Sequence, residues 1–194
     1  MPRVSPERLA ATRRQILDGA RLAFARHGYE GATVRLLEQS TGLSRGAIFH
    51  HFADKDALFL ELARDDAEEM AAVVAEHGLV QVMRDLRTRD AGWLGVQLEV
   101  SRRLRTDPRF RRRWEKHLRT VAAATRTRLI RQRAAGIVRP DVPVHVLVNF
   151  LSLVHDGLVA HLAAGLSPQQ LDSVLDLVED TVRTRPTERK RNPA

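Results

Sequence analysis

The residues best suited to chemistry gather in the stretch TGLSRGAIFHHFADKDALF, which runs from Thr41 to Phe59. It holds an arginine, Arg45, and two adjacent histidines, His50 and His51. Such residues can bind a metal, form a catalytic patch or hold DNA. Adjacent residues on a helix point about 100 degrees apart and do not easily share one ion, so a metal site on the two histidines is disfavoured.

The spacing of the same stretch favours a helix-turn-helix. A helix from about Val34 to Ser40 meets a turn around Gly42, where glycine permits a positive φ, and Ser44 caps a second helix. Such a helix fits the major groove with its N-terminal residues at base edges. We predict that Arg45 reads a base, guanine above all, while most of the others position the DNA backbone. The candidate DNA contacts are Thr33, Ser44, Arg45, Gly46, Phe49, His50, His51 and Lys55.

A second set of candidates consists of charges on helix faces that should be buried. Arg128 and Glu179 both fall within apolar stripes, and Asp156 lies in a polar line on a helix that is apolar nearly all round. A buried charge must be paired or coordinated, so Arg128 and Glu179 form either an internal ion pair or part of a polar ligand site. Glu99 and Arg102 are weaker candidates because their helix is polar on more than one side.

The charge types indicate which ligand such a site would take. The planar fork of an arginine matches a carboxylate, whereas Glu179 would repel a carboxylate ligand unless a hard cation bridged the two. Glu179 and Asp156 are therefore the candidate ligands of a divalent cation that binds together with a small carboxylate.

Composition limits the partners and the chemistry. The 194 residues include 32 basic and 24 acidic ones, a net charge of +8 that favours a polyanionic partner. There is no cysteine, which excludes disulfides, thiolate metal sites and cysteine nucleophiles. The start lacks the apolar run of a secretory signal, and we see no run long enough for a membrane span, so we expect a cytoplasmic protein with no membrane partner.

Apolar residues recur every three or four positions, so the chain predicts an all-α fold of about nine helices. Caps and glycines predict one helix from Asp107 to Gly136, another from Pro143 to Gly165, and a last one that ends near Arg183. We expect a helix-turn-helix DNA-binding domain over residues 1–55 and a helical-bundle ligand-binding and dimerisation domain over residues 56–185. A disordered basic tail should follow over residues 186–194.

The motifs FARHGYEGATV, STGLSRGAIFHHF and DKDALF resemble the DNA-binding domain of the TetR family of transcriptional regulators. This resemblance implies a homodimer that presents two recognition helices to a palindromic operator. The family usually has tyrosine where this chain has Phe49, and small apolar residues where it has Glu38 and Thr41. Further segments, RTDPRF and VLDLVEDTVR among them, look like a subgroup that represses aconitase genes. The subgroup resemblance implies citrate or another tricarboxylate as effector, with Mg²⁺ bound beside it and no obligatory cofactor.

Taken together, these features predict an effector-responsive DNA-binding repressor of aconitase or other genes of central carbon metabolism. Two alternatives stay open: a nucleoid-type protein that binds DNA by charge without sequence preference, and a TetR-like regulator of other genes with a different effector. An enzyme is not expected, because we find no nucleophile elbow, phosphate loop or metal-spaced histidine pair.

Overall fold

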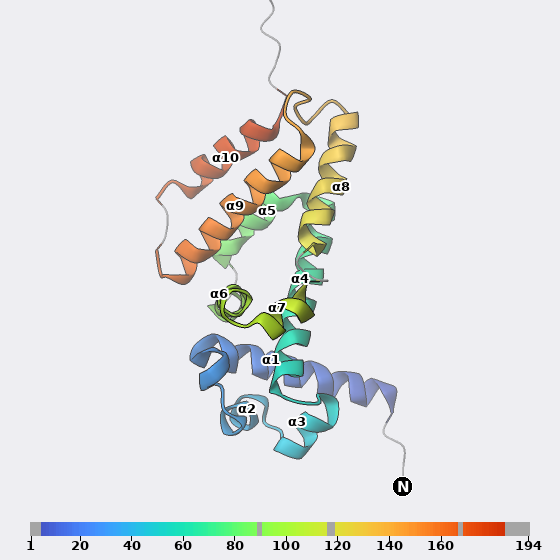
Figure 1. Ribbon diagram of the computed structural model, residues 1–194, viewed down its shortest axis with the longest axis vertical. Coiled ribbons are helices and arrows are strands. Elements are labelled where there is room, and N and C mark those ends of the chain that lie inside the picture. The colour runs from blue at the N-terminus through green and yellow to red at the C-terminus, as the bar shows by residue number, and fades with distance from the viewer. Residues whose placement is uncertain (1–4, 89–90, 116–118, 167–168, 185–194) are drawn as a thin grey trace, which may run out of the picture.

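The structure is a computed structural model that describes residues 5–88, 91–115, 119–166 and 169–184. Within these ranges the regular secondary structure consists of helices and one isolated β-bridge between Val138 and Arg183 (Figure 1). The all-α prediction is confirmed, with ten α-helices in these ranges where about nine were expected. The helices are α1 Pro6–Gly31, α2 Val34–Thr41, α3 Arg45–His51, α4 Lys55–His77, α5 Leu79–Asp85, α6 Ala91–Thr106, α7 Pro108–Trp114, α8 Thr120–Ala134, α9 Val144–Ala163 and α10 Leu171–Val182, with a 3₁₀ helix η1 at Leu86–Thr88.

The helix starts follow the capping residues of the sequence. The side chains of Thr33, Ser44 and Asp54 each accept a hydrogen bond from the backbone amide three residues later. The first helix bends at Gly28, and one more turn leads on to Gly31. These local signals therefore fix where α2, α3 and α4 begin.

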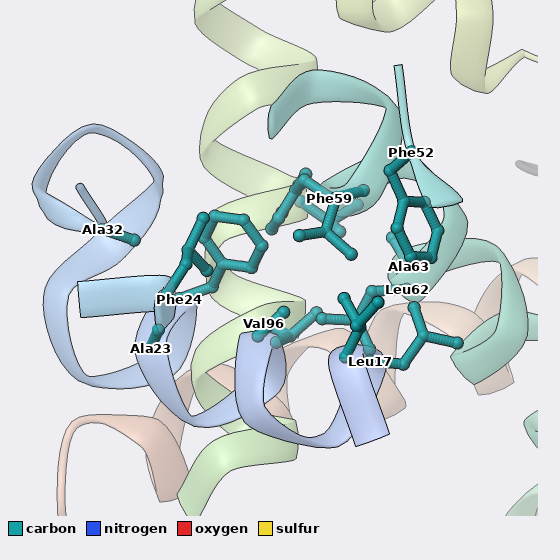
Figure 2. Packing of buried hydrophobic residues seen from close by; sticks show 14 of the residues in the cluster. Leu17, Ala23, Phe24, Ala32, Phe52, Phe59, Leu62, Ala63 and Val96 are labelled. Atoms are coloured by element: carbon teal, nitrogen blue, oxygen red, sulfur yellow. The ribbon is translucent and has the colours of Figure 1, made fainter. Parts of the chain in front are cut away.

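The first three helices pack around one hydrophobic cluster, part of which Figure 2 shows. Phe24 of α1, Leu37 of α2 and Ile48 of α3 are fully buried in it. The predicted boundary at residue 55 falls at the start of α4, but the cluster continues past it to Phe59 of α4 and Val96 of α6. The helix-turn-helix thus shares its core with α4, α6 and α7.

A second cluster fills the other end of the molecule, where the C-terminal half of α4 packs against α5 and α8, and α9 and α10 complete the cluster (Figure 1). The long α4 runs from one cluster to the other, with Leu58 and Leu62 in the first and Met70 and Val74 in the second. The α4 helix therefore connects the packing of the second cluster to that of the helix-turn-helix.

The single helix expected from Asp107 to Gly136 is wrong, because the structure has two helices there, α7 and α8. The reason is the division of the core. Phe110 and Trp114 of α7 are buried in the first cluster, whereas Leu129 of α8 is buried in the second. The predicted tail, residues 186–194, lies outside the described residues.

Candidate functional sites

The α2 and α3 helices form the predicted helix-turn-helix, and their own side chains brace it. Gly42 ends α2 with a φ of 68°, the left-handed conformation that the turn requires. The hydroxyl of Thr41 is buried, donates to the carbonyl of Leu37 at 2.8 Å and accepts from the amide of Leu43 at 3.2 Å. Gln15 of α1 donates to the carbonyl of Thr41 at 2.9 Å. The turn is therefore held from both sides.

Glu38 has a role that the sequence did not reveal. Its Oε1 accepts a hydrogen bond from the backbone amide of Arg45 at 2.6 Å, while the hydroxyl of Ser44 accepts from the amide of Ala47 at 3.3 Å. Both acceptors satisfy free amides in the first turn of α3, and the carboxylate also suits the positive end of the helix. The recognition helix is thus capped twice, and one cap comes from α2.

Most of the predicted DNA contacts lie on the open side of this motif. Thr33, Ser44, Arg45, Gly46 and His50 are exposed. Phe49 and His51 are half-buried, and Phe49 packs against the first cluster. The histidine rings meet edge to face at 5.7 Å, and the described residues contain no group of three or more possible metal ligands. This surface presents polar and cationic groups of the kind that contact a groove of DNA.

Lys55, a candidate contact of the DNA backbone, packs against the end of α1. Its ammonium donates to the carbonyl of Tyr29 at 2.8 Å and sits 4.4 Å from the centre of the Tyr29 ring. The contact ties the start of α4 to the end of α1. A phosphate contact would use the two remaining ammonium protons.

A pocket of about 130 Å³ lies between the C-terminal end of α4 and helices α5, α8 and α10. Its lining includes Arg128 and Glu179, the two residues that the sequence singled out from buried stripes. Further polar side chains, which the sequence did not mark as ligand candidates, also line the pocket. They include Gln81, Arg84, Thr125, Gln132 and Arg183.

Arg128 and Glu179 do not pair with each other. Glu179 accepts from Arg84 at 3.1 Å through one oxygen and from Arg183 through the other. Arg128 donates through Nη1 to the carbonyls of Ala75 and Glu76, at 3.1 and 2.5 Å. Burial, and then the charge of Arg131, lower the pKa of Arg128. The pocket therefore presents more positive than negative charge, which favours an anion.

The other ligand candidates lie elsewhere. Asp156 is exposed on α9, with an oxygen 3.1 Å from Nδ1 of His155. Glu99 and Arg102 pair with each other on α6, with their charged atoms 2.7 Å apart. The structure thus brings Arg128 and Glu179 together and leaves Asp156, Glu99 and Arg102 outside this pocket.

Comparison with known proteins identifies the family. The model of the bacterial regulatory proteins of the tetR family matches residues 16–62. The chain is 58% identical to the HTH-type transcriptional repressor Rv1474c of Mycobacterium tuberculosis, an alignment that covers 94% of this chain and 99% of that protein. It is 55% identical to the HTH-type transcriptional repressor AcnR of Corynebacterium glutamicum, covering 90% and 94%. The chain belongs to the TetR family of transcriptional repressors.

Solved structures confirm the fold of this TetR-family repressor. GusR of Salmonella enterica matches with a TM-score of 0.72 at 18% identity, over 93% of this chain and 98% of that one. A TetR regulator from Chloroflexus aurantiacus matches with a TM-score of 0.73 at 22% identity, over 91% and 98%. The expectation of a repressor rather than an enzyme is also confirmed.

A buried arginine lies where α1, α4, α6 and α7 meet beside the first cluster. Arg103 of α6 is 6% exposed, and its guanidinium lies 3.9 Å from the ring centre of Tyr29 and 4.5 Å from that of Phe110. It donates to Asp56 of α4 at 2.7 Å and also to Asp107. One cation therefore holds α1, α4, α6 and the start of α7 together at the junction.

Proposed function

We propose that this TetR-family repressor is an effector-controlled homodimer that represses aconitase or other genes of central carbon metabolism. Its effector is citrate or a related tricarboxylate, bound together with a divalent cation such as Mg²⁺. One observation carries the effector class: Arg128 and Glu179 lie in the same pocket but do not neutralise each other. The resemblance to repressors of aconitase genes supports the target.

The charged side chains of the pocket fit an anionic effector that binds together with a divalent cation. Arg84, Arg128 and Arg183 supply positive charge, and Glu179 is the only carboxylate among the described lining residues. Mg²⁺ keeps several waters and is often held by one or two protein carboxylates plus ligand oxygens. Glu179 would therefore hold the cation in place of its partners Arg84 and Arg183, and the cation's other ligands would come from the effector and from water. Asp156 is exposed on α9 and is not among the described residues that line this pocket.

The homodimer is supported by an apolar surface on α9 and α10, which lie on one side of the molecule (Figure 1). Leu153 is 74% exposed and Val146, seven residues earlier on the same face of α9, is 44% exposed. Leu177 and Val174 of α10 are 68% and 48% exposed. By length and hydropathy α9 also passes as a membrane span, with a third of its apolar window buried. A second copy of the chain would cover this surface instead.

In the dimer, the two α3 helices would enter successive major grooves about one helical turn apart, roughly 34 to 36 Å. Arg45 would read a base, and Thr33, Ser44, His50, His51 and Lys55 would hold the backbone. Because α4 reaches from the pocket to the helix-turn-helix, an effector that prefers one orientation of α4 would change the spacing of the α3 helices. Such a repressor acts on the chromosome and hence in the cytoplasm.

Fluorescence anisotropy tests the proposal. Labelled DNA from the region upstream of an aconitase gene is titrated with the repressor in the presence of scrambled competitor DNA, with and without citrate and MgCl₂. Competitor-resistant binding that citrate and Mg²⁺ alter is expected. Binding that the competitor abolishes would instead favour recognition by charge alone, or an operator elsewhere.

Glu179→Gln separates the role of the cation from that of the anion. The amide keeps the shape of the side chain but removes the charge that would hold a divalent ion. We expect citrate affinity measured by calorimetry to lose its dependence on MgCl₂. Asp176→Gln, which also removes a carboxylate paired with Arg84 but outside the pocket lining, is the control. Unchanged citrate binding by Glu179→Gln with Mg²⁺ present would overturn the cation site.

A further inference from the structure

The C-terminal end of α4 leaves carbonyl groups that the helix itself does not satisfy. The last helical bond there runs from the amide of Gly78 to the carbonyl of Val74, at 2.9 Å. Gly78 then turns the chain with a φ of 92°, and α5 begins at Leu79. The carbonyls of Ala75 and Glu76 therefore need donors from elsewhere.

Those donors come from α8. Nη1 of Arg128 donates to both carbonyls, and Nη2 of Arg131 donates to that of Ala75 at 3.2 Å. A side chain on Gly78 would place its Cβ 3.0 Å from Nε of Arg128, so the absence of a side chain lets the guanidinium lie close over the turn. Arginines near the C-terminal end of a helix commonly bind the last carbonyls and complement its negative pole.

The same guanidinium faces the pocket. Arg128 lines it, whereas Arg131 is not among the described lining residues. Among the described residues only Nη1 of Arg128 has a hydrogen-bond acceptor, so the N–H groups of Nε and Nη2 are not used within this part of the chain. They form an edge with two parallel N–H groups, the arrangement that binds a carboxylate through both oxygens.

We propose that Arg128 is a bridge: one edge of its guanidinium is fixed to the last turn of α4, and the opposite edge binds a carboxylate of the effector. This inference rests on the proposed carboxylate effector and adds the route by which its binding reaches α4. Because the guanidinium is planar and rigid, the effector fixes the position of the end of α4 relative to α8. Lysine at this position has one ammonium and cannot present two opposed edges.

The test uses the full-length protein with citrate and MgCl₂ as probe, and compares wild type with Arg128→Lys, Arg128→Gln and Arg131→Gln. Arg126→Lys, on the exposed side of the same helix, is the matched control. Hydrogen–deuterium exchange of a peptide covering the last turn of α4 reports on the bridge. Without ligand, Arg128→Gln should exchange about fivefold faster than wild type there, as expected when the hydrogen bonds from Nη1 to the last carbonyls are lost.

With citrate and MgCl₂, the last turn of α4 should exchange more slowly in wild type and in Arg126→Lys. Arg131→Gln should bind citrate as tightly as wild type. The ratio of the operator Kd with saturating citrate to that without it should be roughly tenfold in wild type. In Arg128→Lys this ratio should fall toward one. Equal exchange in ligand-free Arg128→Gln and wild type, or an unchanged ratio in Arg128→Lys, would overturn the bridge alone. Failure of wild type to bind citrate would overturn the proposed effector, and the bridge with it.

Discussion

Asp66 provides a quantitative test of the packing between the first and fourth helices. Its side chain is fully buried on α4, with one oxygen 2.6 Å from the guanidinium of Arg21 on α1. Burial raises the pKa of Asp66 from 3.8 to about 6, because desolvation outweighs the attraction of Arg21. The arginine is not fully buried, so water weakens its field at the carboxylate.

The sign of the effect on stability follows from proton binding. Between pH 3.8 and about 6 the folded protein holds a proton on Asp66 that the unfolded chain releases. The stabilisation is therefore complete below pH 3.8 and is lost as the pH rises through about 6. A difference of about two pKa units corresponds to roughly 3 kcal/mol, of which roughly 2 kcal/mol falls between pH 4.5 and 7.5.

Asp66→Asn removes this titration while keeping the shape of the side chain and an oxygen for Arg21. We expect the difference in unfolding free energy, variant minus wild type, to rise by roughly 2 kcal/mol in favour of the variant from pH 4.5 to 7.5. Urea denaturation at fixed protein concentration measures it, with Asp18→Asn on the exposed side of α1 as the control for an added amide. A difference that stays constant with pH, or falls, would refute the argument.

Three further outcomes are expected. Arg45→Ala should relax the operator sequence preference by roughly 1 to 3 kcal/mol at one base pair, whereas Lys55→Ala should weaken binding to all DNA alike and lower its salt dependence. Identical specificity profiles for the two variants would contradict the separate roles of base reading and backbone contact. Leu153→Glu should shift the proposed dimer to monomer in sedimentation, because it places a charge on the exposed apolar face of α9. A variant that sediments as a dimer would place the interface elsewhere. Arg103→Met should lower the unfolding free energy by roughly 2 to 4 kcal/mol, because it breaks the ion pairs of a buried arginine. Arg105→Met, at an exposed position of the same helix, should lower it by less than about 0.5 kcal/mol. Equal losses would show that Arg103 does not hold α1, α4, α6 and α7 together.

Local signals in the sequence were enough for the helix-turn-helix. Capping by Thr33, Ser44 and Asp54 and the turn at Gly42 depend on residues three or four positions apart, so the sequence could locate them. The expected single helix across α7 and α8 failed because local periodicity does not tell which of two clusters an apolar residue joins.

The sequence by itself also determined that Arg128 and Glu179 were unusual, because each interrupts an apolar stripe and a charge in such a place requires a partner. Only the tertiary structure decided what those partners are: Arg84 and Arg183 for Glu179, and the carbonyls at the end of α4 for Arg128. Asp156 carries the same kind of signal, yet it faces outward on α9. The physical reason is that the periodicity of a helix determines on which of its faces a residue lies. The packing of the other helices determines which residues that face contacts.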